Sequence, residues 1–124
     1  MKLIIGGLGQ GKLNYVLSAS GLTEADTART LTDKPIIYGL HAIIRDLLDQ
    51  GRDPSEVLTF AASHPSVIFI CDEVGSGVVP VRPEERAWRE AVGRVCCELA
   101  KEADTVVRVF CGLPMVLKGR TEWN

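Results

Sequence analysis

One stretch of this sequence, residues 3–12, reads Leu3-Ile4-Ile5-Gly6-Gly7-Leu8-Gly9-Gln10-Gly11-Lys12. Its first three residues are apolar and two of them are β-branched, so they predict a short buried strand that stops at the paired glycines. The residues that follow predict a helix over Lys12–Ser20, because apolar side chains recur on one helical face and Gly21 suits the C-terminal cap. The stretch therefore predicts a strand, a glycine-rich turn and a helix in direct succession.

The turn has the spacing of a phosphate-binding loop. Gly6, Gly11 and Lys12 match the first seven positions of the pattern G-x-x-x-x-G-K-[ST], in the strand-to-helix context that the pattern requires. Glycines let successive N–H groups face one anion, while the helix N-terminus and the lysine add positive potential. We therefore expect a triphosphate to bind, and the candidate binding residues are Gly6, Gly7, Gly9, Gln10, Gly11, Lys12 and Leu13. The alternative is a glycine-rich turn that binds nothing.

A magnesium ion is expected beside the phosphates, although the turn lacks one of its usual ligands. Leu13 occupies the position that normally supplies a hydroxyl to Mg²⁺. Asp72 and Glu73 directly follow the most apolar segment of the chain, residues 67–71, where P-loop proteins place an acid that holds the metal or its water shell. We expect either carboxylate to hold Mg²⁺ through water. The alternative is an exposed acidic turn.

Two further residues are candidates for the site. His41 follows the predicted strand over residues 35–38, where it could act as a nucleophile, an acid/base or a phosphate contact; the alternative is a hydrogen-bonded histidine at a helix start. Arg94 lies beside Gly93 in a long predicted helix and has the fork geometry that suits phosphate, whereas most helix arginines only solvate a surface. The candidate catalytic residues are thus Lys12, Glu73 and His41.

Strand and helix patterns alternate along the chain. Strands are also predicted at residues 35–38, 67–71 and 105–110, helices at 40–51, 53–63 and 84–103, and a short edge strand around 115–117. We expect an α/β fold, a P-loop NTPase-like three-layer sandwich with a mostly parallel sheet of about four to five strands. Ligands of such sheets bind at the carboxyl ends of the strands, where all the candidate residues except Arg94 are expected.

Length and composition limit the remaining possibilities. The 124 residues predict one domain over the whole chain, and 46% apolar with 24% charged residues is typical of a soluble globular protein. The net charge of -2 comes without a basic stripe, which argues against a nucleic-acid partner. The four cysteines lack metal-site spacing, and no apolar run approaches the length of a membrane span. We therefore expect a cytoplasmic protein with reduced thiols.

Three segments of the sequence carry a family resemblance. They read Cys71-Asp72-Glu73-Val74-Gly75-Ser76-Gly77-Val78-Val79-Pro80, then Arg89-Glu90-x-x-Gly93-Arg94-Val95, then Leu99-Ala100-x-x-Ala103-Asp104. Together with the turn at residues 6–12, they resemble the bifunctional adenosylcobinamide kinase / adenosylcobinamide-phosphate guanylyltransferase family of cobalamin biosynthesis. The resemblance covers the first 20 residues and about 71 to 118. Two departures are Leu13 in the turn and Cys96, which replaces an asparagine.

The resemblance implies a nucleotide-dependent transferase. ATP or GTP would bind at the turn with Glu73 at the nucleotide site, a corrinoid would be the acceptor, and the protein would be a homo-oligomer. The segment that carries the family's guanylylated histidine is missing between the first helix and the middle strands, and His41 is not matched to that histidine. The alternatives are a catalytically silent nucleotide-binding or partner-binding module of the same fold, and a P-loop kinase for an unrelated small molecule.

Overall fold

The computed structural model describes residues 1–75, 81–120 and 123. Its elements in chain order are β1 (Lys2–Gly6), α1 (Lys12–Ser20), the 3-10 turn η1 (Glu24–Asp26), β2 (Thr27–Ala28), β3 (Ile36–Tyr38), α2 (Leu40–Asp49), α3 (Glu56–Ser63), β4 (Ile68–Asp72), α4 (Pro83–Glu102), β5 (Thr105–Phe110) and β6 (Leu113–Lys118). The motif that begins at Glu73 is described as far as Gly75, and its continuation over 76–80 lies outside the described residues.

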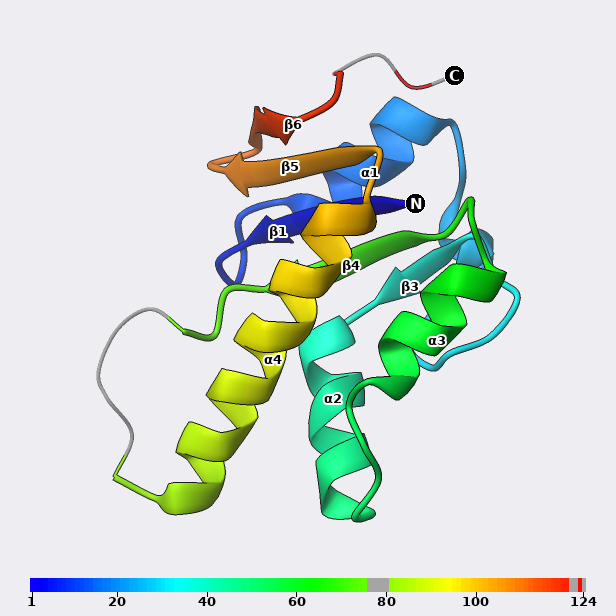
Figure 1. The fold of residues 1–124 in the computed structure, drawn as a ribbon. Coiled ribbons are helices and arrows are strands. Elements are labelled where there is room, and N and C mark those ends of the chain that lie inside the picture. Colours follow the sequence, from blue (N-terminus) through cyan, green and yellow to red (C-terminus); the bar gives the residue numbers. More distant parts are fainter. Residues whose placement is uncertain (76–80, 121–122, 124) are drawn as a thin grey trace.

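A six-stranded sheet forms the centre of the molecule, in the order β2-β3-β4-β1-β5-β6 (Figure 1). All neighbouring strands pair in parallel except β5 and β6, which form an antiparallel pair. In the register of the sheet, Ile4 of β1 lies beside Ile70 of β4 and Val107 of β5. The parallel strands therefore end at one edge, and β1 delivers the glycine-rich turn between the ends of β4 and β5.

Helices cover both faces of the sheet, with α1 on one face and α2, α3 and α4 on the other (Figure 1). Alternate strand residues supply the two cores, as the period of a strand requires. On β4, Phe69 belongs to the core beneath α2 and α4, whereas Ile70 belongs to the core that contains Val16 of α1. The expected α/β fold with three layers and a mostly parallel sheet is confirmed.

The structure extends the expected sheet at both ends. The short strand β2, which was not among the predicted strands, pairs with β3, and the tail forms the full strand β6. The helix expected from residue 53 begins later, at Glu56. Asp53 accepts a hydrogen bond from the backbone N–H of Ser55 at 2.9 Å, so the chain forms a turn before the helix.

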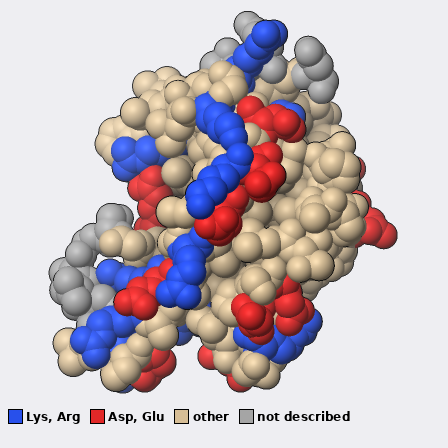
Figure 2. Space-filling view, in the orientation of Figure 1, with Lys and Arg blue, Asp and Glu red and all other residues tan. Residues whose placement is uncertain are grey.

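Charged side chains of both signs are interleaved along α4 on the face shown in Figure 2. The polar side of this helix therefore faces solvent, while Val92, Val95 and Leu99 are buried against the sheet. None of the helices in the described part of the chain combines the length and the apolar run that crossing a membrane requires.

Phe69 tests how strongly this core holds the sheet. Its side chain on β4 is 0% exposed, whereas Phe110 at the end of β5 is 55% exposed. We expect Phe69→Ala to lower the free energy of unfolding by about 3–5 kcal/mol, because the substitution leaves a cavity in a packed core. Phe110→Ala, the matched control, should change it by less than about 0.5 kcal/mol. Urea denaturation followed by circular dichroism measures both, and equal losses would contradict the assigned core.

Candidate anion-binding site

The turn between β1 and α1 has the backbone shape that its glycines predicted. Gly9 and Gly11 adopt φ angles of 73° and 89°, in the left-handed region that favours glycine. Gly11 is the N-cap of α1, and no side chain caps the helix. Since the first N–H groups of a helix have no partner within the helix, the start of α1 can donate to an anion.

Gln10 ties this turn to the turn between β5 and β6. Its side-chain Oε1 accepts a hydrogen bond from the backbone N–H of Cys111 at 2.8 Å, and its carbonyl accepts one from Gly112 at 2.8 Å. A Cβ atom on Gly11 would lie 3.4 Å from the Cα of Gly112, so the two turns are in close contact. The side chain of Gln10, a candidate phosphate contact, therefore holds the turn in place.

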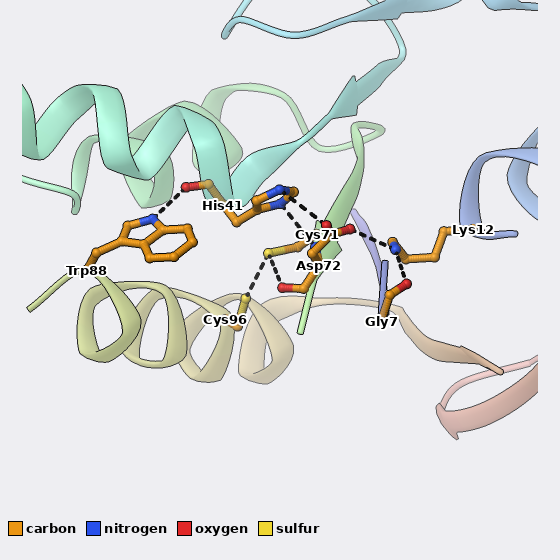
Figure 3. Close-up of polar contacts among 7 residues, drawn as sticks. All are labelled: Gly7, Lys12, His41, Cys71, Asp72, Trp88 and Cys96. Atoms are coloured by element: carbon orange, nitrogen blue, oxygen red, sulfur yellow. Dashed lines mark hydrogen bonds and ion pairs between the residues drawn. The ribbon is translucent and has the colours of Figure 1, made fainter. Parts of the chain in front are cut away.

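Lys12 lies beneath the turn with only 5% of its side chain exposed (Figure 3). Its ammonium donates a hydrogen bond to the carbonyl of Gly7 at 2.7 Å and forms an ion pair with Asp72 Oδ1 at 2.8 Å. A buried ammonium needs such partners, because an unpaired charge away from water is strongly unfavourable. The structure thus joins Lys12 and Asp72, two candidates 60 positions apart in the sequence.

His41 completes a chain of contacts with Asp72 (Figure 3). Its Nδ1 accepts a hydrogen bond from the backbone N–H of Asp72 at 3.1 Å, so the neutral ring carries its proton on Nε2. This nitrogen lies 3.4 Å from Asp72 Oδ2. Burial lowers the pKa of His41, and the charges of Lys12 and Arg29 lower it further, against the opposing effect of Asp72. The hydrogen bond and the lowered pKa both favour the neutral imidazole.

Helix α4 supports this arrangement from below. The indole N–H of Trp88 donates to the carbonyl of His41 at 2.8 Å, and Cys96 lies with its Sγ 3.8 Å from that of Cys71 (Figure 3). The contact with Cys96 and burial together raise the pKa of the Cys71 thiol. Cys71 is therefore a protonated thiol that packs behind Asp72.

Glu73 points to a different partner, which the sequence analysis did not identify. Its two carboxylate oxygens form a bidentate contact with Arg108 of β5, at 2.6 Å from Nε and 3.1 Å from Nη2. This hydrogen bonding raises the pKa of Arg108. The backbone N–H of Glu73 also donates to the carbonyl of Gly6 at 2.9 Å. A lone arginine within the apolar strand Thr105–Phe110 was the sequence signal for this pair.

The two remaining candidates lie in different places. Leu13 packs against the core on the α1 side of the sheet, so the position that usually carries a hydroxyl supplies an apolar contact here. Arg94 is exposed on α4 and lines a pocket with Ser55 and Glu98, on the face of the sheet opposite α1. The structure therefore does not bring Arg94 together with the turn.

A small pocket lies over the turn. Its volume is about 130 Å³, and it is lined by Leu8, Gly9, Gly11, Lys12, Leu13, Asn14, Tyr38 and Asp72. Pockets that enclose a whole small-molecule ligand usually measure roughly 300–1,000 Å³. This pocket is therefore large enough for a group the size of phosphate and too small for a whole nucleotide.

The residues near the turn do not present a ligand set for magnesium as they are arranged. Mg²⁺ requires oxygen ligands, and Leu13 has none. The oxygens of Asp72 face Lys12 and His41, and those of Glu73 face Arg108. Within residues 1–75, 81–120 and 123, no three or more His, Cys, Asp or Glu side chains gather where they could hold a metal ion.

The ion pair between Lys12 and Asp72 can be measured by a double-mutant cycle. We expect Lys12→Met and Asp72→Asn each to destabilise the free protein, because each leaves a poorly solvated group without its partner. The double variant should lose less free energy of unfolding than the two single variants lose in sum. We expect urea denaturation to give a coupling energy of about 1–3 kcal/mol. Additive losses would show that the two charges do not stabilise each other.

Comparison with known proteins places this chain in a family. The family model for cobinamide kinase / cobinamide phosphate guanyltransferase matches residues 43–117, which include Asp72, Glu73, Arg94 and Arg108, while the turn and His41 precede the match. No curated protein matches the chain. Because the matched residues form more than half of the chain, the chain belongs to the cobinamide kinase / cobinamide phosphate guanyltransferase family.

Proposed function

We propose that this protein binds the phosphates of ATP or GTP at residues 6–12 and transfers a nucleotide-derived group to a corrinoid. The observation that carries the proposal is the buried ammonium of Lys12, held under an uncapped helix start in a member of a nucleotide-dependent family. Backbone amides and an ammonium stabilise phosphate charge in transferases of this kind. The pocket of about 130 Å³ supports phosphate as the bound group.

The contacts of Lys12 suggest how the site accepts an anion. In the free protein its ammonium is paired with Asp72, so the positive charge is already compensated. A phosphate at the turn would compete with Asp72 for this ammonium. The turn glycines allow the close approach of a phosphate, because side chains there would obstruct the backbone N–H groups.

For His41 the arrangement supports a positioning role. Nδ1 accepts a hydrogen bond and Nε2 carries the ring proton, so neither nitrogen of the neutral ring offers a lone pair to a substrate. A nucleophile or general base needs such a lone pair. His41 instead fixes the main chain at Asp72. The contact of Glu73 with Arg108 links the residue after β4 to β5, across the intervening strand β1, and the assignment of Glu73 as a catalytic residue stays a prediction.

A silent nucleotide-binding module of the same fold is the second candidate. Leu13 contributes apolar packing where a hydroxyl is usual, and both acidic side chains at the edge are already paired with cations. These observations are the ones that would suit a site that binds phosphate without transferring it. Such a module would bind nucleotide without turning over a corrinoid.

Homo-oligomerisation is also proposed, since β6 lies at the edge of the sheet (Figure 1) and carries exposed apolar side chains. Leu113, Met115 and Leu117 are all exposed on it, and unpaired edges with apolar side chains favour association. We expect sedimentation equilibrium to show an oligomer that Leu113→Lys weakens. Val81→Lys, at another exposed apolar position, should leave it unchanged. A monomer at all concentrations would contradict the proposal.

The transferase proposal is tested with adenosylcobinamide and ATP or GTP. We expect the wild-type protein to form the phosphate ester, and Lys12→Ala to reduce its rate by about 100-fold or more, because charge stabilisation at the phosphates is lost. Lys101→Ala is the matched control, since Lys101 is an exposed lysine of α4 paired with Glu98. Mass spectrometry of the corrinoid measures the product.

The outcomes separate the two candidate functions. Nucleotide binding without turnover of adenosylcobinamide would favour the silent module, and a screen of other small hydroxyl compounds would then test for an unrelated acceptor. If wild type and Lys12→Ala neither bind nucleotide nor form product, the assignment of the turn fails.

A further inference from the structure

The carboxylates at the edge of the sheet are already neutralised by the protein itself. Asp72 lies 2.8 Å from the ammonium of Lys12, and Glu73 is held by the guanidinium of Arg108. Leu13 contributes no oxygen. Phosphoryl-transfer sites normally use divalent cations to balance the phosphate charge, so a site without metal ligands needs positive side chains instead.

Arg29 is such a side chain. It follows β2, and its guanidinium carbon lies 4.3 Å from the centroid of the Tyr38 ring, a stacked cation–π contact. Tyr38 itself lines the pocket over the turn, together with Lys12 and Asp72. The Arg29 guanidinium also lies near the start of α2, with Nη1 3.7 Å from the place where a Cβ on Gly39 would be. The short strand β2 therefore brings a cation to the border of the phosphate pocket.

The charge of Arg29 is available for an anion. The side chain is exposed, and no carboxylate of the described ranges 1–75 and 81–120 forms an ion pair with it. Its positive charge reaches His41, whose pKa it helps to lower. Stacking on Tyr38 restricts the long side chain before any ligand arrives, which reduces the entropy lost on binding. An arginine fork in this position suits a phosphate oxygen pair.

We propose that the turn binds nucleotide phosphates without a divalent cation, and that Lys12 and Arg29 supply the positive charge. Asp72 forms an ion pair with the Lys12 ammonium until a phosphate replaces it. The inference rests on the proposed nucleotide function and gives Asp72 a role opposite to that of a metal ligand. As an internal anion, Asp72 competes with phosphate. As a metal ligand, it would help phosphate to bind.

Asp72→Asn distinguishes these two roles by the sign of its effect. The asparagine keeps the size of the side chain and removes its charge. The hydrogen bond from the backbone N–H of residue 72 to His41 Nδ1 does not involve the substituted side chain. We expect the variant to bind ATP, GTP and inorganic triphosphate about tenfold more tightly than the wild type in EDTA, which corresponds to about 1.4 kcal/mol. Isothermal titration calorimetry measures these affinities, with parallel titrations in excess Mg²⁺.

Arg29→Gln should weaken binding of the same three ligands by about tenfold, in EDTA and in Mg²⁺ alike, because a charge-assisted hydrogen bond is lost. Arg52→Gln is the matched control. Arg52 lines the same surface pocket as Arg29 but is paired with Glu56, and its substitution should leave the affinities unchanged. For the wild type we expect similar affinities in EDTA and in Mg²⁺. Thermal unfolding of each variant without ligand confirms that it is folded.

The results separate a failure of this inference from a failure of the proposed function. Nucleotide binding that appears only with Mg²⁺ and is lost in Asp72→Asn would overturn the metal-free site while the nucleotide function stands. Equal affinities of wild type and Arg29→Gln would overturn the role of Arg29. An absence of binding in EDTA and in Mg²⁺, with folded wild-type protein, would overturn the nucleotide function and this inference together.

Discussion

The ion pair between Lys12 and Asp72 is the contact on which the candidate site depends. It joins the first turn of α1 to the end of β4 and buries an ammonium beneath the glycine-rich turn. A buried ammonium without a partner would be costly, so this pairing fixes where Lys12 lies. The same pairing decides how the site responds to an anion, since any phosphate must compete with a carboxylate already in place.

Contacts from the opposite face of the sheet keep Asp72 in position. The indole N–H of Trp88 on α4 donates a hydrogen bond to the carbonyl of His41, and the imidazole of His41 accepts one from the backbone N–H of Asp72. Arg45 of α2 stacks on Trp88, 4.0 Å from its ring centroid, and pairs with Glu85. A continuous series of contacts thus runs from α4 through the start of α2 to the glycine-rich turn. The region that matches the family model contains most of this support, while the turn itself precedes it.

Close packing at the end of β1 explains why small residues are needed there. A Cβ atom on Gly6 would come within 2.6 Å of the carbonyl of Val109, and the neighbouring methylenes of Lys12 leave no space on the other side. Leu13 adds apolar contacts on the α1 side of the sheet. The turn is therefore packed tightly into the fold through its first and last residues, and only its middle, with the exposed Leu8, faces solvent.

The sequence by itself determined the elements and their order. Apolar runs at β1, β4 and β5, the helical period of α1 and the glycines of the turn are local signals, and they placed Gly6, Asp72 and Glu73 at one edge of a parallel sheet. The edge pairing of β2 with β3 was less clear because only two residue pairs carry it. The tail predicted only a short edge strand around 115–117, although β6 pairs with β5 over five residue pairs. Only the tertiary structure decided the partners: Asp72 for Lys12, Arg108 for Glu73, Tyr38 for Arg29. These partners come from different strands and helices, and no local pattern records which charges meet when the chain folds.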